Sequence, residues 1–263
     1  MLLWKILKDK NMSVYIITHK RYKSLINQPK SYKPLLVGAD MGNIGLPSYL
    51  KDNSGINISS KNRSFCELTG EFWVWKNRTD KIVGFDHYRR YFVNENYKFH
   101  KIFPPNFLRE QKIKKILKDY DIILPQKYDL GRKTIKEQFN DSHDPEVWKK
   151  MRIIISKKYP EYMSDLNWVE NQKKEYLCNM FITKREIFEE YCSWLFDILF
   201  TLEKKVDISK YDNYNQRMFG FVSERLLNVW VYHNSLKIKE YPVYFYSEKN
   251  LFQKIVAKLN NKH

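Results

Sequence analysis

Apolar residues recur along the chain with two periods, and together these periods predict strands that alternate with helices. Short runs rich in β-branched and aromatic residues are typical of buried strands, and they lie at 13–18, 81–85, 121–125 and 176–183. Apolar positions spaced three and four residues apart predict amphipathic helices. We expect these helices over 59–76, 105–119, 133–156, 184–204 and 214–231. Such alternation is typical of an α/β fold.

Between the first strand and the first helix, residues 35–55 are rich in Gly, Pro, Asn and Asp. This composition predicts a long irregular loop, and loops of that length are often functional. Polar residues also follow the strand at 81–85 directly. Ligand sites of open α/β sheets lie at the carboxyl ends of strands, so we expect a site there.

The composition fits one folded domain with an anionic partner. The 263 residues are 43% hydrophobic, which is enough for a single core. Lys and Arg total 47 against 30 Asp and Glu, and a net charge of +17 favours a nucleic acid, an anionic membrane or a phosphorylated substrate. The lysines are dispersed and no nucleic-acid-binding motif is present, so we expect no nucleic-acid partner.

The cysteines and the apolar runs indicate the cellular compartment of the protein. Cys66, Cys178 and Cys192 form no CxxC pair, which argues against a disulfide framework or a zinc site and fits a reducing cytoplasm. No apolar run approaches the length of about 20 residues that spans a bilayer. The opening residues lack the features of a signal peptide, so we expect a cytoplasmic protein that does not span the membrane.

The densest polar cluster is FDHYRRYF, which follows the strand at 81–85. Adjacent guanidinium groups suit a diphosphate because each can bind phosphate oxygens in a bidentate manner, so Arg89 and Arg90 are candidate diphosphate ligands. The alternative is that both form surface ion pairs. Asp86 and His87 are candidates for catalysis or for binding a divalent cation, Mn²⁺ or Mg²⁺. Two residues do not make a metal site, and a hydrogen-bonded structural histidine is the alternative for His87.

Two further segments carry polar residues among large apolar ones. In the segment 56–77, Asn57 and Asn62 are candidates for binding a base or ribose, and Glu67 lies close enough to line the same cleft. Helix capping by a serine of this segment is the alternative. Asn179 interrupts the predicted strand at 176–183, and Glu224 lies within an apolar helix. A carboxylate there must lie at the water edge, pair with an arginine such as Arg217 or Arg225, or serve in chemistry.

Short motifs are spread along the chain from residue 13 to residue 242. They are ITHK, VGAD, DNSGINISSKNRSFCELTGEFWVWKN, HYRRYF, DIILP, NMFI and FGFVSERLL. Together these motifs resemble a family known as DUF4422, found in bacterial capsular and exopolysaccharide gene clusters and treated as glycosyltransferases.

The resemblance implies one GT-A-like domain over 13–245, with a Rossmann-like nucleotide-binding half and a mixed central sheet flanked by helices. By that analogy Thr18, His19 and Lys20 line the nucleotide, and Asn57, Asn62, Glu67 and Asn179 line the donor cleft. GT-A enzymes usually carry an Asp-x-Asp metal motif, whereas this chain has Asp86-His87-Tyr88 at about that place. Metal dependence therefore stays open, and Arg89 with Arg90 could supply the charge of a metal.

The resemblance further implies transfer of a hexose, with galactofuranose as one candidate, from a UDP-sugar to a polyprenyl-diphosphate-linked glycan. Glu224 is the candidate general base if the reaction inverts configuration, because a hydroxyl nucleophile needs a nearby carboxylate. A noncatalytic carbohydrate-binding or nucleic-acid-binding protein is the alternative.

The two ends of the chain lie outside the predicted domain. An extension at 1–12 and a basic tail at 246–263 carry apolar and lysine residues at helical spacing. Such segments favour reversible binding to the anionic inner face of the cell membrane. Ordinary surface helices are the alternative.

Overall fold

The computed structural model describes residues 12–94 and 105–246. Apart from Met12 and Tyr246, the expected N-terminal extension and basic tail lie outside the described residues. Across the described ranges no helix is both long and apolar enough to cross a bilayer.

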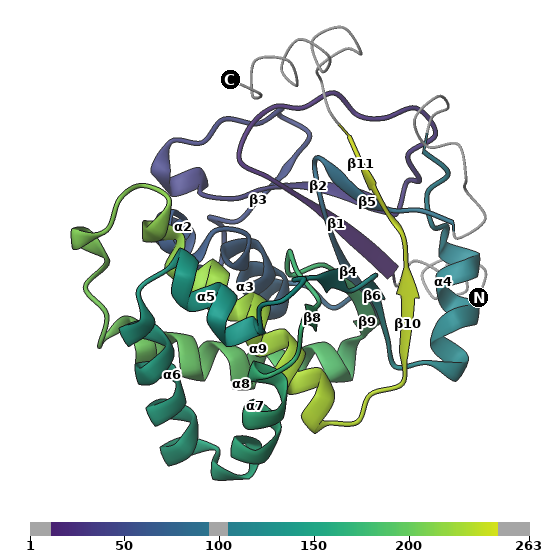
Figure 1. Ribbon diagram of the computed structural model, residues 1–263. Coiled ribbons are helices and arrows are strands. Elements are labelled where there is room, and N and C mark those ends of the chain that lie inside the picture. The colour runs from purple at the N-terminus through teal and green to yellow at the C-terminus, as the bar shows by residue number, and fades with distance from the viewer. Residues whose placement is uncertain (1–11, 95–104, 247–263) are drawn as a thin grey trace, which may run out of the picture.

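A mixed sheet runs through the centre of the molecule (Figure 1), as the sequence predicts. In the described residues its main path has the order β10-β6-β9-β4-β1-β2-β3, and β5 joins β4 to β11. The strands β3, β2, β1 and β4 are parallel, whereas β9 is antiparallel to both β4 and β6. The bounds are β1 Met12–Thr18, β2 Tyr32–Leu36, β3 Leu50–Lys51, β4 Ile82–His87, β5 Arg90–Phe92, β6 Ile122–Pro125, β9 Phe181–Lys184, β10 Ile238–Tyr241 and β11 Val243–Phe245.

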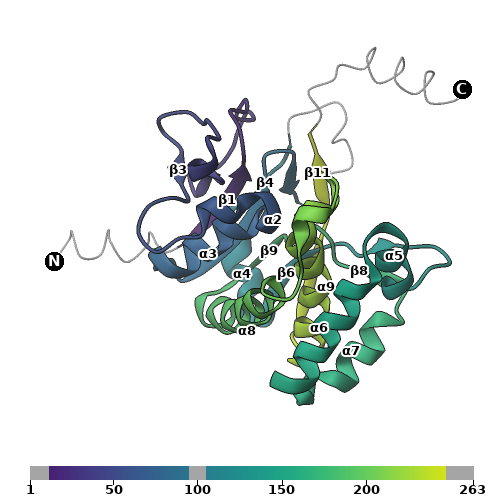
Figure 2. The ribbon, with the colours of Figure 1, turned by 90° about the vertical axis from the view of Figure 1, so that its left-hand side faces the viewer.

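Helices cover both faces of this sheet (Figures 1 and 2), and alternate residues of β1 therefore enter two different cores. Tyr15 and Ile17 belong to the core that includes residues of α3 (Leu68–Asn77), α8 (Arg185–Glu203) and α9 (Met218–His233). Val14 and Ile16 belong to the opposite core, which α4 (Glu110–Asp119) covers. All seven residues of β1 are buried as a result.

Three helices form an outer layer around α8 and α9 (Figure 2). They are α5 (Ile135–Ser142), α6 (Pro145–Lys158) and α7 (Met163–Glu170). We expected a single helix over 133–156, but it is divided because Asp144 caps the second helix and Pro145 occupies its first turn. A short separate ribbon pairs β7 (Tyr128–Asp129) with β8 (Lys174–Glu175).

Two other predicted elements are interrupted by residues with left-handed backbone. The helix expected over 59–76 splits into a 3-10 turn at Ser59–Lys61, α2 (Asn62–Phe65) and α3, because Cys66 has φ 52°. The strand expected over 176–183 begins only at Phe181, because Cys178 and Asn179 have φ values of 78° and 46°. Both interruptions lie beside the site described next.

The remaining differences concern element ends. The helix expected from residue 105 begins at Glu110. The segment 35–55, expected to be irregular, contains the end of β2, a 3-10 turn at Ala39–Met41 and the short strand β3.

Candidate functional site

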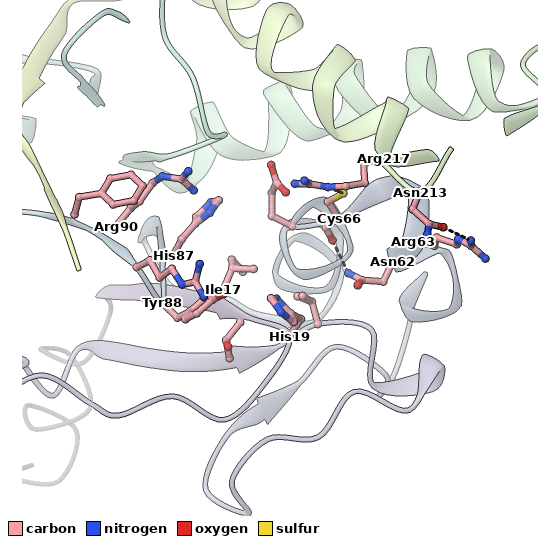
Figure 3. A pocket seen from close by; sticks show the side chains of 15 residues that line it. Ile17, His19, Asn62, Arg63, Cys66, His87, Tyr88, Arg90, Asn213 and Arg217 are labelled. Carbon is pink, nitrogen blue, oxygen red and sulfur yellow. Dashed lines mark hydrogen bonds between the residues drawn. The ribbon is translucent and has the colours of Figure 1, made fainter. Parts of the chain in front are cut away.

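A cavity of about 640 Å³ opens at the carboxyl ends of β1 and β4 (Figure 3). Its walls come from segments far apart in the sequence. These are the end of β1, the α2 region, the β4–β5 turn and the loop that precedes α9, and Phe245 of β11 completes them. Figure 3 shows His87 and Arg90 on one side of the cavity and Arg63 and Arg217 on the other.

A buried carboxylate holds one rim of the cavity in place. Asp52 accepts hydrogen bonds from the main-chain N–H of Gly38 at 2.9 Å and from the hydroxyls of Ser59 and Thr69 at 2.5 and 2.6 Å. These contacts join the loop after β2 to the helical segments that follow. Gly70 lets α3 lie directly against the end of β1, since a Cβ there would come within 2.7 Å of Ile17 Cδ1.

The break between α2 and α3 faces the cavity. Asn62 Nδ2 donates to the carbonyl oxygen of Cys66 at 2.6 Å, which stabilises the left-handed residue. Arg217 Nε lies 3.4 Å from Cys66 Sγ. Burial raises the pKa of the Cys66 thiol to about 12, so the sulfur is protonated at neutral pH and is not a thiolate nucleophile.

Four arginines line the cavity, and in the described part of the chain none of them forms an ion pair with a carboxylate. Arg63 donates to Asn213 Oδ1 at 3.0 Å. The guanidinium groups of Arg89, Arg90 and Arg217 lie 4.9, 4.7 and 5.2 Å from the ring centroids of Tyr88, Phe245 and Phe221. Their charges are therefore available to an anion that enters the cavity.

The two histidines of the cavity are uncharged at neutral pH. Burial, with a smaller effect from Arg90, lowers the pKa of His87 to about 3. Burial and the neighbouring Lys20 and Arg89 also lower the pKa of His19. Nε2 of His87 is buried and neither accepts nor donates a hydrogen bond within the described residues.

Glu67 is the one carboxylate among the described residues that line the cavity. Its Oε1 accepts a hydrogen bond from Asn179 Nδ2 at 2.8 Å. Burial raises the pKa of Glu67, although the Asn179 amide and the charge of Arg217 act in the opposite direction.

Of the residues predicted from the sequence, the structure places seven around this cavity. They are Thr18, His19, Asn62, Glu67, His87, Arg89 and Arg90. Five others do not line it, and they are Lys20, Asn57, Asp86, Asn179 and Glu224.

Asp86 and His87 lie on opposite faces of the sheet. Side chains alternate along β4, so His87 reaches the cavity while Asp86 is buried on the other face, near Tyr32 and Tyr91. Asp86 Oδ2 accepts the main-chain N–H of Phe92 at 3.3 Å. Burial raises the pKa of Asp86 well above its usual value. The two side chains therefore cannot share one cation.

Lys20 and Asn57 form hydrogen bonds with residues two positions away in the chain. The main-chain N–H of Lys20 donates to Thr18 Oγ1 at 3.2 Å, and Lys20 Nζ lies 5.6 Å from the centroid of the Tyr88 ring. Asn57 Oδ1 accepts the main-chain N–H of Ser59 at 3.1 Å, so its side chain stabilises a turn.

Asn179 and Glu224 lie behind the cavity wall. Glu224 accepts the main-chain N–H of Cys178 at 2.9 Å and pairs with Arg225 at 2.7 Å, whereas Arg217 lines the cavity. Catalytic roles for Asp86, His87 and Glu224 stay predictions. In the described ranges no three His, Cys, Asp or Glu side chains gather as a cation site, so we derive no step through a metal.

Sequence reasoning missed several residues of the cavity, chiefly Arg63, Cys66, Arg217 and Phe245. Arg63 had a usable signal, because it precedes Glu67 by four residues in a predicted helix and such residues share a face. Arg217 and Phe245 had none, because tertiary contacts bring them to the cavity.

Comparisons with known proteins give a family for this chain and a solved structure with a similar fold. The family described as "Domain of unknown function (DUF4422)" matches residues 13–235, which confirms the resemblance drawn from the motifs. The fold is similar to the apo structure of WbbM, a bifunctional glycosyltransferase, with a TM-score of 0.80 and 28% sequence identity. The match covers 90% of this chain and 46% of WbbM, so the chain spans about half the length of that protein. No curated protein sequence matches the chain.

Proposed function

The chain belongs to the DUF4422 family, and from that premise we propose that it is a glycosyltransferase that uses a nucleoside-diphosphate sugar. The observation that carries the proposal is the set of four arginines that line a cavity at the carboxyl ends of β1 and β4 and have no carboxylate partner among the described residues. Ligands of α/β sheets bind at such edges, and unpaired guanidinium groups suit phosphate oxygens. The similarity to a bifunctional glycosyltransferase supports the same activity class.

In this proposal the β4–β5 turn binds the diphosphate of the donor. Arg89 and Arg90 contact its oxygens and stabilise the negative charge that develops on the leaving group when the bond to the sugar breaks. Thr18 and His19, at the end of β1, contact the nucleotide, and the neutral His87 offers Nε2 as a hydrogen-bonding group. Asn62 shapes the same wall through its bond to Cys66.

The finer part of the proposal concerns the substrates. We take the donor to be a UDP-hexose, with galactofuranose as one candidate, and the acceptor to be a polyprenyl-diphosphate-linked glycan of capsule or exopolysaccharide synthesis. A net charge of +17 supports work at the anionic cytoplasmic face of the membrane. A diphosphate-linked acceptor would itself be attracted by that charge.

A donor-hydrolysis screen tests the proposal. Purified protein is incubated with a panel of nucleotide sugars, with and without Mn²⁺, and nucleotide release is measured. We expect release from one donor, and we expect Arg89→Ala and Arg90→Ala to lower it by roughly 100-fold or more without loss of fold. Lys112→Ala, an exposed change on α4, is the matched control.

The negative outcomes separate the alternatives. Absence of both release and binding across the panel would overturn the proposal. Glycan binding without turnover of any donor would favour a noncatalytic carbohydrate-binding protein. Tight nucleic-acid binding at physiological salt would favour a nucleic-acid-binding protein.

A further inference from the structure

Among the acids of the described residues, Glu67 is the one whose side chain lines the cavity. It lines the same cavity as Arg89 and Arg90, and it lies at the start of α3, where the chain leaves the left-handed residue Cys66. The other acids considered from the sequence do not reach this cavity. Asp86 is buried on the opposite face of the sheet, and both carboxylate oxygens of Glu224 are engaged by Cys178 and Arg225.

The turn at Cys178 and Asn179 lies behind the cavity, and it places the side-chain amide of Asn179 against Glu67. Cys178 and Asn179 are consecutive non-glycine residues with positive φ. Asn adopts this conformation readily, whereas for Cys it costs about 1 to 3 kcal/mol and persists only where surrounding contacts impose it. Asn179 Nδ2 contacts Glu67 Oε1 at 2.8 Å and Ser223 Oγ at 2.7 Å.

The contacts that impose this turn come from consecutive residues of α9. Glu224 accepts the main-chain N–H of Cys178, and Ser223 meets the side chain of Asn179. Arg225, buried beneath, pairs with Glu224 at 2.7 Å and approaches Glu175 at 3.5 Å. Hydrogen bonds therefore connect the polar residues of the FGFVSERLL and NMFI motifs to Glu67.

We propose that Glu67 is the general base that accepts the proton of the acceptor hydroxyl, and that the turn at Cys178 and Asn179 positions it. This inference rests on the proposed glycosyltransferase function. The acceptor oxygen forms a bond to the anomeric carbon while the bond from that carbon to the phosphate oxygen breaks. The hydroxyl proton passes to Glu67, and the nucleoside diphosphate leaves with the bonding electron pair beside Arg89 and Arg90. Because this is one displacement, the anomeric configuration inverts.

The environment of Glu67 suits a base. Burial raises its pKa, which strengthens it as a proton acceptor, while the Asn179 amide and the charge of Arg217 act in the opposite direction. A carboxylate that acts as a nucleophile is instead kept fully ionised by a polar, partly solvated site.

The test compares Glu67→Gln with Glu71→Gln, using the donor that the wild-type chain turns over in the screen. We expect Glu67→Gln to lower kcat by roughly 100-fold to 10,000-fold, the usual contribution of a general base. UDP affinity, measured by calorimetry, should stay within about three-fold, because the base does not hold the nucleotide. Glu71 lies one turn further along α3 with no hydrogen bond to either carboxylate oxygen in the described residues, so Glu71→Gln should keep kcat.

Asn179→Asp tests the positioning role. Asp tolerates a left-handed backbone, so the turn can persist, but the change replaces the amide donor with a second acid, and both effects raise the pKa of Glu67. The acid limb of the pH profile of kcat should therefore move to higher pH. A residue that only stabilises the fold would lower the melting temperature without moving that limb.

Each outcome decides the inference. Near-normal kcat in Glu67→Gln, loss of UDP binding in that variant, or a product of retained configuration by NMR would overturn it. If Glu67→Gln does not fold, Glu67→Ala is assayed with added formate, and we expect at least a ten-fold recovery of rate by formate. Absence of recovery in a folded variant counts against the base. Failure of the wild-type chain to turn over any donor would instead overturn the proposed function itself.

Discussion

Arg225 pairs with Glu224 at 2.7 Å, and through this pair it fixes the carboxylate that accepts the main-chain N–H of Cys178. Arg225 also donates to Gln138 of α5 at 2.5 Å and approaches the buried Glu175. The interior of α9 is thereby joined to α5, β8 and the turn that precedes β9. A buried polar network of this kind is destabilised when one of its members loses a partner.

We expect Glu224→Gln to lower stability more than catalysis. The Gln oxygen can still accept from Cys178, but Arg225 loses its closest carboxylate, which should cost roughly 1–3 kcal/mol of unfolding free energy. Chemical denaturation gives this value, and kcat should fall far less than in Glu67→Gln. A large fall in kcat at unchanged stability would instead assign the base to Glu224.

Arg217→Gln should change both donor binding and the pH profile. The charge of Arg217 lowers the pKa of Glu67, so its removal raises that pKa and moves the acid limb of kcat/KM to higher pH. Loss of one cation from the cavity should also raise the donor KM, by roughly ten-fold. Steady-state kinetics from pH 5 to 9 check both effects. Lys210→Gln, an exposed change in the same loop region, should leave them unaltered.

Glu71→Gln should stabilise the protein at high pH. Burial raises the pKa of Glu71 well above its usual value, and Glu67 adds to the effect. A raised carboxyl pKa in the folded state means that the folded chain binds the proton more tightly, so wild-type stability falls as pH rises above the unfolded value. Gln carries no titrating proton, so its advantage over Glu in melting temperature should grow from pH 5 to pH 8. An advantage that is equal at both pH values would show that Glu71 does not titrate in this way.

The sequence predicted the parts of this site that depend on local pattern. The strands before Thr18 and His87 follow from β-branched runs, and the ends of parallel strands meet at one edge, so the β4–β5 turn was expected at a site. The break at Cys66 was not predicted, because the apolar spacing of three and four residues continues through it. Its left-handed backbone is unfavourable locally and is held by contacts from Asn62 and Arg217.

Contacts between segments far apart in the chain could not be predicted from the sequence either. Phe245 reaches the cavity only because β11 pairs with β5, and β5 is a three-residue strand with no pattern of its own. Asn179 was correctly singled out as an interruption in an apolar run. Its partner Glu67 lies 112 positions earlier in the sequence, and no local rule links them.

Gly70→Ala should disturb the cavity through the contact between α3 and β1. Ala favours a helix interior over Gly by about 1 kcal/mol, whereas overpacking typically costs about 1–3 kcal/mol. The new Cβ would lie 2.7 Å from Ile17 Cδ1 and 2.8 Å from Val37 Cγ1, so we expect overpacking to win and the net loss of stability to be about 1 kcal/mol.

Because Ile17 and Val37 both line the cavity, the same change should raise the donor KM. Denaturation and kinetics of Gly70→Ala are compared with those of the double variant Gly70→Ala/Ile17→Val, which removes the Cδ1 methyl group from the closest contact. A double-mutant cycle should then show favourable coupling between the two changes, since the second relieves the crowding that the first creates. If Gly70→Ala is as stable as wild type and binds donor equally well, then α3 can move away from β1 without disturbing the cavity, and the close approach at Gly70 does not position the site.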